Sequence, residues 1–294
     1  MSGARDAAGS VLVTGATGNV GAAVVRHLLE HGETVVSALR DLADPGLVPG
    51  SEARAFDFEN PSGWDDALAG VDRVFLLRPP TIADVRQHLL PFVDLALERG
   101  VRHIVFLSLQ GVQFNRATPH HAVEKHLRAK KAPFAFLRPN FFMQNLSTTY
   151  RADIRDRSEI TVPAAGARTA FIDTDDVGRV AARVLTEPGH LGKAYTLSGE
   201  QSLNYTAVAR MLSAELGHRI RYTRPSPEEY TELLRERGAA DDYIDVQSMI
   251  YTVVRRGVSA FPNRTVRRLT GRPATTFAQF AHREHAVWER GAGA

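Results

Sequence analysis

The sequence predicts an α/β fold in which a doubly wound parallel sheet carries helices on both faces. Two observations predict it. Short apolar runs alternate with amphipathic segments through the first half of the chain, and Gly, Asn-Pro and Pro-Pro separate them. The first apolar run also passes directly into a glycine turn and then into a helical pattern. The second half lacks this regularity, which predicts a smaller, mainly helical C-terminal lobe.

The elements follow from these patterns in chain order. The predicted strands are the run that begins at Val11 and the segments 34–39, 53–56, 73–77, 103–107, 134–137 and 194–197. Asn19 is expected to cap the first helix, and Gly32 ends it. The other predicted helices are 60–70, 84–99, 119–130, 176–185, 205–216, 227–237, 243–254 and 276–288.

This pattern divides the chain into two parts. Residues 10–150 are expected to form a nucleotide-binding core, to which residues 170–200 return. Residues 151–169 and 201–294 are expected to form the smaller lobe, packed over the carboxyl ends of the strands, where open α/β sheets bind ligands.

Composition narrows the function classes. The 294 residues are 44% hydrophobic and 23% charged, which is typical of a globular chain. Cysteine is missing, which excludes disulfides and thiolate metal sites and favours a reducing, cytoplasmic setting. The formal charge is only +3, so we expect neither nucleic acid nor membrane as a partner. The late arginines, from Arg255 to Arg272, are expected to form a solvated face.

The first glycine turn predicts a dinucleotide site. Gly15, Gly18 and Gly21 follow the strand and open the helix, with Thr17, Asn19 and Val20 between them. Glycines at this spacing let the backbone approach a pyrophosphate and let the helix lie close to the strand. The helix N-terminus offers unpaired N–H groups and partial positive charge to two phosphates. These features predict a sheet of the Rossmann type.

The end of the second predicted strand indicates which dinucleotide binds. Arg40 stands at its tip, and a guanidinium there suits the 2′-phosphate of NADP(H). Asp41 follows, and a carboxylate near the 2′ position would oppose a phosphate, so NADP(H) is preferred and NAD(H) stays possible. Asp57 and Phe58 are placed to meet the adenine edge, although Asp57 is equally explained as a turn residue.

Two further strand ends are expected to border the nicotinamide half of the cofactor. One carries Leu77, Arg78 and Pro79, and Arg78 could hold a phosphate or an acidic substrate, or lie in solvent. The other carries Ser108 and Gln110. Ser108 is a candidate catalytic residue, although serine at a strand end often only forms a turn.

At this point the chain resembles the NmrA-like group of atypical short-chain dehydrogenase/reductase relatives. The resemblance rests on the glycine turn, on residues 120–124 (HHAVE), on residues 137–146 (LRPNFFMQNL) and on the ending that begins RLTGRP at residue 268. It implies a Rossmann fold that binds NADP(H), or less often NAD(H). It also implies that Pro139, Asn140, Phe141 and Phe142 lie beside the nicotinamide. Such relatives include quinone-type reductases and catalytically silent redox sensors.

The chain departs from the wider family at the catalytic dyad. That family uses Tyr-x-x-x-Lys, in which the lysine helps the tyrosine to pass a proton to the substrate. Here Arg116 and His120 stand at about those positions. His120 or His121 could replace the tyrosine as proton donor, because histidine titrates near neutrality, or both could only line the helix start.

A metal site is not expected. His120, His121 and Glu124 could approach one ion, but no third ligand is apparent beside the pair His120 and Glu124. Asp173, Asp175 and Asp176 are instead expected to cap and begin the following helix.

The leading hypothesis is an NADP(H)-dependent oxidoreductase that reduces a small conjugated carbonyl, quinone or imine by hydride transfer. Gln110, Phe142 and Met143 would line a pocket for an aromatic or conjugated substrate, in a monomer or homodimer. Two alternatives remain open. One is a non-catalytic NADP(H) sensor that acts through a partner, and the other is a redox-neutral epimerase or isomerase that uses NAD(P).

Overall fold

The computed structural model describes residues 9–289, so residues 290–294 of the predicted lobe lie outside it. The chain divides into two compact units. Of the described residues, the sheet unit contains 9–139, together with Thr174–Leu197 and Arg268–Gly271. The helical unit contains Asn140–Asp173, Ser198–Arg267 and residues 272–289.

The sheet unit is built on seven parallel strands in the order β3-β2-β1-β4-β5-β6-β9. The order reverses between β1 and β4, which creates the crevice at the carboxyl ends where such sheets bind nucleotides. The core strands are fully buried because helices cover both faces. The strands are β1 (Ser10–Thr14), β2 (Val35–Leu39), β3 (Glu52–Ala55), β4 (Val71–Leu77), β5 (His103–Leu107), β6 (Phe134–Pro139) and β9 (Lys193–Leu197).

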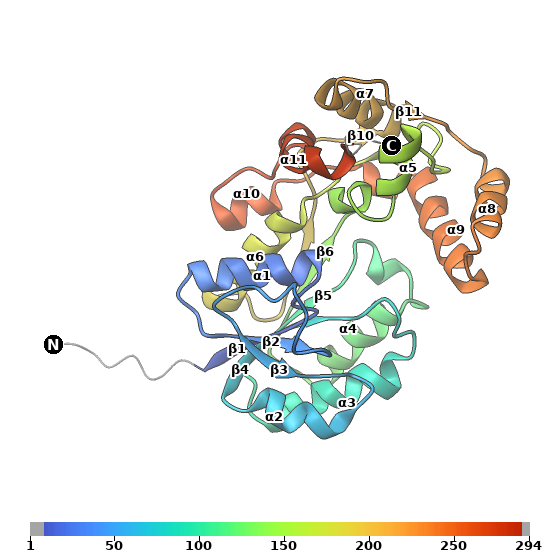
Figure 1. The fold of residues 1–294 in the computed structure, drawn as a ribbon. Helices are drawn as coiled ribbons and strands as arrows, with labels where there is room; N and C mark the ends of the chain where they lie inside the picture. Colours follow the sequence, from blue (N-terminus) through green and yellow to red (C-terminus); the bar gives the residue numbers. More distant parts are fainter. Residues whose placement is uncertain (1–8, 290–294) are drawn as a thin grey trace. The chain divides into compact units, whose positions relative to one another are not determined.

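Helices α1 and α6 pack together on one face of this sheet, while α2, α3 and α4 cover the other face (Figure 1). Each predicted helix of this part is present, although the helix expected from Asn60 begins as a 3₁₀ turn capped by that residue. The elements are α1 (Asn19–Glu30), η1 (Pro61–Gly63), α2 (Trp64–Leu68), α3 (Val85–Glu98), η2 (Val112–Phe114), α4 (Pro119–Ala129) and α6 (Thr174–Thr186).

The helical unit has its own core, in which Tyr251, Phe277, Phe280 and Trp288 are buried. Four of its helices match the predicted segments: α7 (Tyr205–Leu216), α8 (Pro227–Glu236), α9 (Asp241–Arg255) and α11 (Phe277–Glu284). The last predicted segment, 276–288, ends in a 3₁₀ turn, η5 (His285–Trp288). The unpredicted elements are short: η3 (Met143–Leu146), α5 (Arg151–Arg157), β7 (Glu159–Ile160), β8 (Arg168–Thr169), β10 (Leu203–Asn204), β11 (Arg221–Tyr222), η4 (Val258–Ala260) and α10 (Thr265–Thr270, which crosses the unit boundary).

The unit boundary differs from the predicted one. Residues 140–150 were expected to belong to the core, but contacts assign them to the helical unit. The side-chain amide of Asn140 donates to the carbonyl oxygen of Ser259 at 2.9 Å, and the backbone N–H of Met143 donates to the carbonyl oxygen of Ile172 at 2.9 Å. The chain therefore passes from the sheet unit into the helical unit immediately after β6.

Candidate functional site

The glycine turn at the end of β1 is shaped by two glycines. Gly15 has φ +65°, a conformation that L side chains rarely adopt, and a Cβ there would lie 3.1 Å from the Leu77 side chain. A Cβ on Gly21 would lie 2.0 Å from the carbonyl oxygen of Gly15, which no packing adjustment could accommodate. Helix α1 therefore begins directly against the turn, and only glycine permits that approach.

The start of α1 corrects the expectation for Asn19. The capping residue is Gly18, in an extended conformation, and Asn19 is the first helical residue. No side chain caps this helix, and its first turn carries no acidic residue. Gly18 and Asn19 are exposed, whereas Val20 and Gly21 are buried. The backbone N–H groups at this helix start have no capping side chain, so they keep their positive potential for a ligand, as an anion site requires.

This arrangement contrasts with the other α-helices whose N-caps are described between residues 9 and 289. Each of them has either a side-chain cap or an acidic residue in its first turn, both of which compete with an external anion. The side-chain caps are Asp84, Thr118, Asn204, Ser226 and Thr276, and the helices with acidic first turns but no such cap are α2, α5 and α9.

Thr14 ties the turn to the neighbouring strand. Its buried hydroxyl accepts a hydrogen bond from the Leu77 backbone N–H at 2.7 Å, and it donates toward the Leu77 carbonyl oxygen at 3.2 Å. The carboxyl ends of β1 and β4 are thus held together at the point where the strand order reverses. Thr14 was not among the predicted site residues, although a hydroxyl residue that ends an otherwise apolar strand is a signal for such a role.

The end of β2 presents one free cation. Arg40 is exposed and forms no hydrogen bond or ion pair with the described part of the chain. The carboxylate of Asp41 instead accepts the backbone N–H of Ala43 at 2.9 Å and so belongs to its own loop. An incoming anion at this strand end would therefore meet Arg40 as an unpaired guanidinium.

The contacts of Asp57 and Phe58 are those of a turn and a core residue. Asp57 accepts the backbone N–H of Glu59 at 2.9 Å through its carboxylate, and its carbonyl accepts the indole N–H of Trp64 at 2.7 Å. Phe58 is buried, and its ring lies 5.6 Å from that of Phe92. The Phe58 side chain is therefore not available to an adenine ring, and only the backbone of this turn could meet one.

Arg78, at the end of β4, organises its own loop. Its Nη1 donates to the carbonyl oxygens of Pro79 at 2.9 Å and of Ile82 at 2.6 Å. Its Nε is buried without a hydrogen-bond partner. Burial lowers the pKa of this guanidinium. Arg78 is thus half-buried and not a freely solvated side chain, because its Nη1 is bound to the loop.

Ser108, after β5, belongs to a buried charged cluster. Its hydroxyl donates to Glu124 Oε1 at 2.8 Å. Arg138 of β6 donates to both oxygens of the same carboxylate, at 2.9 and 2.6 Å. The sequence analysis weighed Glu124 only as part of a motif and as a possible metal ligand, and Arg138 only as part of a motif. The signal for their pairing was a charged residue in each of two buried, otherwise apolar segments.

The two histidines at the start of α4 lie in different surroundings. Burial, followed by the nearby Arg78 cation, lowers the pKa of His120 to about 3, so this ring is neutral near pH 7. The expectation that His120 titrates near neutrality is therefore wrong, and the cause is desolvation. His121 is half-buried, and its Nδ1 lies 3.3 Å from the carbonyl oxygen of Val112.

In the helical unit, the segment that follows β6 is tightly held. Asn140 is buried, donates to Ser259 and accepts the backbone N–H of Phe141 at 2.8 Å through Oδ1. Both ends of its side-chain amide are thus engaged, and they fix the backbone at Phe141. In the sheet unit, Pro139 accepts the backbone N–H of Gln110 at 3.0 Å, so two predicted site residues are neighbours there.

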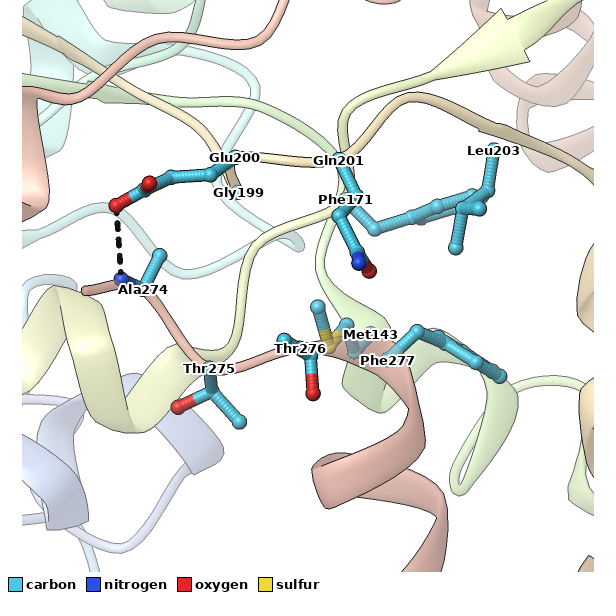
Figure 2. Close-up of a pocket in the computed structure, with 10 residues that line it drawn as sticks. All are labelled: Met143, Phe171, Gly199, Glu200, Gln201, Leu203, Ala274, Thr275, Thr276 and Phe277. Carbon is cyan, nitrogen blue, oxygen red and sulfur yellow. Dashed lines mark hydrogen bonds between the residues drawn. The ribbon is translucent and has the colours of Figure 1, made fainter.

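A small cavity of about 20 Å³ lies within the helical unit. Figure 2 shows the segment with Glu200 and Gln201 on one side of it and Thr275 and Thr276 on the other. Met143, one of the expected pocket residues, lines it; Phe142 and Gln110 do not. The lining is completed by Phe171, Gly199, Leu203, Ala274 and Phe277.

The acidic cluster near residue 175 is paired. Asp175 accepts from His27 at 3.1 Å, and Asp173 accepts from Gln144 at 2.7 Å. Asp175 and Asp176 lie in the first turn of α6, as expected. Among residues 9–289, no three His, Asp or Glu side chains gather as metal ligands. Within the same residues, none of the helices combines the length and apolar character needed to cross a bilayer.

Known proteins resemble this chain over almost its whole length. The sequence profile of the NmrA-like family matches residues 7–254. The NAD(P)H azoreductase of Xenophilus azovorans is 32% identical over 285 residues, which are 94% of this chain and 98% of the relative.

Solved structures share the fold. An Escherichia coli quinone oxidoreductase complexed with NADPH has a TM-score of 0.83 at 24% identity, over 93% of this chain and 99% of that one. A Citrobacter sp. triphenylmethane reductase complexed with NADP(H) has a TM-score of 0.82 at 24% identity, over 94% and 100%. At that identity the likeness concerns the fold. The family match, together with the azoreductase relative, shows that this chain belongs to the NmrA-like family.

Proposed function

We propose that this chain is an NADP(H)-dependent oxidoreductase that reduces a small conjugated carbonyl, quinone or imine by hydride transfer. The observation that carries the proposal is the start of α1, where uncapped backbone N–H groups follow a turn that only glycine can form. A diphosphate fits this site because it requires several N–H donors and a close backbone, and no lysine.

The preference for NADP(H) over NAD(H) rests on the end of β2. Arg40 is exposed and unpaired with the described residues, while the Asp41 carboxylate is held by its own loop. A 2′-phosphate would meet the unpaired guanidinium, whose charge favours NADP(H) although the Asp41 carboxylate lies next to it in the sequence. Both structural neighbours are complexes with NADPH or NADP(H), which supports the same assignment. The azoreductase relative is named for NAD(P)H, which agrees with a nicotinamide cofactor of either kind.

The nicotinamide ring supplies the hydride when the cofactor is bound. We assign the glycine turn (Gly15, Thr17, Gly18, Asn19, Val20 and Gly21) to the diphosphate. The strand ends with Leu77, Arg78, Pro79 and Ser108, and the segment Pro139, Asn140 and Phe141, are assigned to the nicotinamide half. The backbone of Asp57 and Phe58 is assigned to the adenine. Gln110, Phe142 and Met143 are assigned to a pocket for an aromatic or conjugated substrate.

The surroundings of His120 favour one class of substrate. A ring whose pKa lies at about 3 carries no proton to donate as a cation near pH 7, so we leave His121 as the candidate proton donor. Quinone-like acceptors need little help from an enzymatic acid, because delocalisation stabilises the reduced anion. We therefore favour them over simple ketones.

The wider setting belongs to the same proposal. We also propose that the protein acts on a small-molecule substrate, as a monomer or homodimer, in the cytoplasm. We assign it no role in binding nucleic acid or membranes. The azo and quinone substrates named for the relatives are consistent with a conjugated acceptor.

The proposal is tested by mixing purified protein with NADPH and a panel of quinones, azo dyes, cyclic imines and simple ketones. Nicotinamide absorbance should fall with at least one conjugated acceptor and stay unchanged with the ketones. The Gly21→Ala variant, whose cofactor site is disrupted, is the control for background oxidation. Cofactor binding without oxidation of any acceptor would contradict a reductase and support the sensing alternative.

A further inference from the structure

The carboxylate of Glu124 is surrounded by hydrogen-bond donors. Glu124 is 4% exposed. Its Oε1 accepts from Ser108 Oγ at 2.8 Å and from Arg138 Nε at 2.9 Å. Its Oε2 accepts from Arg138 Nη2 at 2.6 Å, and Nη2 of Arg128 lies 3.4 Å away. Both oxygens are therefore acceptors, and neither has room for a proton of its own.

Two arginines from different elements hold this carboxylate in place. Arg138 belongs to β6 and Arg128 to α4, and the Arg128 guanidinium lies 4.7 Å from the centre of the Phe136 ring. Bidentate pairing with Arg138 fixes the plane of the carboxylate, since two parallel hydrogen bonds leave it little freedom to rotate. The position of the Glu124 oxygens is thus set before any ligand arrives.

This geometry decides the polarity of Ser108. A serine hydroxyl has one proton and two lone pairs. Because Glu124 Oε1 can only accept, the Ser108 proton points at Glu124. Ser108 is left with acceptor capacity alone, so it can receive a hydrogen bond from a ligand and cannot give one.

We propose that Ser108 accepts a hydrogen bond from the carboxamide NH₂ of the nicotinamide, and that Glu124 is the positioning residue that makes it an acceptor. This inference rests on the proposed function. Ser108 follows β5, at the edge assigned to the nicotinamide half of the cofactor. The carboxamide offers N–H donors there, whereas the oxygens of a quinone or ketone offer only lone pairs.

The inference changes the role expected for Ser108 in the reaction. A hydroxyl committed to Glu124 is not an acid and does not stabilise an oxyanion on the substrate. Ser108 instead fixes the rotation of the carboxamide and hence the orientation of the ring. Its effect belongs to cofactor binding, which can be measured without turnover.

The test compares two dinucleotides by calorimetry. One is NADP⁺, and the other is its acetylpyridine analogue, in which a methyl ketone replaces the carboxamide and removes the N–H donors. We expect wild-type protein to bind NADP⁺ about five- to tenfold more tightly, the value of one hydrogen bond. In Ser108→Ala this preference should fall by about the same factor, because the acceptor is gone.

Matched variants separate this effect from structural damage. Ser10→Ala is the control, because Ser10 is another buried serine of the same unit and lies at the N-terminal end of β1, where its hydroxyl donates to the Gly70 carbonyl oxygen. This variant should keep the wild-type ratio of the two dissociation constants. Ser108→Thr keeps a hydroxyl and should restore the preference. In Glu124→Gln the amide can donate to Ser108 and reverse its polarity, so the preference should fall although the serine is present.

The outcomes are distinct. An unchanged ratio of the two dissociation constants in Ser108→Ala would overturn the inference while leaving the proposed function intact. Failure of the wild-type protein to bind either dinucleotide would overturn the cofactor proposal itself, and this inference with it. If Glu124→Gln does not fold, the ratio in Ser108→Ala still decides.

Discussion

Gly21 shows how one missing side chain can create a binding site. A methyl group at this position would overlap the Gly15 carbonyl oxygen, so the glycine is required for the fold of the turn as much as for any ligand. Gly18 is different, since a Cβ there would lie 3.4 Å from the same oxygen and its backbone is extended. The three glycines of the motif therefore differ in what requires them: a left-handed backbone at Gly15, a close backbone contact at Gly21, and neither at Gly18.

We expect Gly21→Ala to lower the free energy of unfolding by about 1–3 kcal/mol, because α1 must shift away from the turn. The same shift moves the N–H groups of the first turn, so NADP⁺ binding should weaken by at least about tenfold, the loss expected when about one charge-assisted hydrogen bond is misplaced. Urea unfolding and calorimetry measure the two effects. Gly18→Ala is the matched control for folding, and an equal loss of stability in both variants would contradict this account of Gly21.

At the scale of elements, α1 and α6 are joined by a pair of titrating side chains. His27 Nε2 lies 3.1 Å from Asp175 Oδ1, and Nδ1 of the same ring lies 2.8 Å from Glu30. The hydrogen bond with Asp175 raises the pKa of His27 above 6.5, against the opposing effect of burial. In return, His27 lowers the pKa of Asp175 to about 2.

The pair should make stability depend on pH. His27 binds its proton more tightly when folded, so its contribution is complete below pH 6.5 and is lost as the pH rises through the folded pKa. Asp175 contributes above pH 3.8 and loses its contribution as the pH falls toward 2. His27→Gln should therefore cost about 1 kcal/mol at about pH 5.5 and clearly less at about pH 9.

Urea unfolding at both pH values measures this difference. His88→Gln is a suitable control, because His88 has no hydrogen bond or ion pair among the residues described. A cost of His27→Gln that stays constant, or that grows at alkaline pH, would contradict the assignment of the pair.

The sheet unit could be predicted from sequence to within a few residues because its signals are local. Apolar runs, glycines and caps such as Asp84 and Thr118 each act within one turn or strand. The missed elements, such as α5 and α10, span only seven and six residues and carry no full apolar period. Their stability comes from contacts made by distant parts of the chain.

The features of the candidate site also fall into those set by local sequence and those set by contacts between distant residues. The glycine turn and Arg40 lie within or beside local patterns, and the sequence pointed to both. The burial of His120, the engagement of Ser108 by Glu124 and the core position of Phe58 depend on residues far apart in sequence. A pKa or a hydrogen-bond polarity follows from packing, which periodicity does not report.

At the scale of the whole molecule, two separate parts of the sheet unit are proposed to bind the two phosphate groups of the cofactor. The start of α1 offers N–H donors for a diphosphate, and the end of β2 offers a free guanidinium for a 2′-phosphate. Neither depends on how the helical unit is placed. Dinucleotide binding can therefore be tested before any substrate is known.

The most direct test is calorimetric titration of the wild-type protein and of Arg40→Ala with NADP⁺ and NAD⁺. The wild type should bind NADP⁺ saturably at one site. Arg40→Ala should weaken NADP⁺ binding by about ten- to a hundredfold, the value of a charged hydrogen bond, and leave NAD⁺ binding nearly unchanged. Arg99→Ala, which removes an exposed partner of Asp65, is the control cation. Absence of saturable binding of either dinucleotide to the wild-type protein would contradict the central claim.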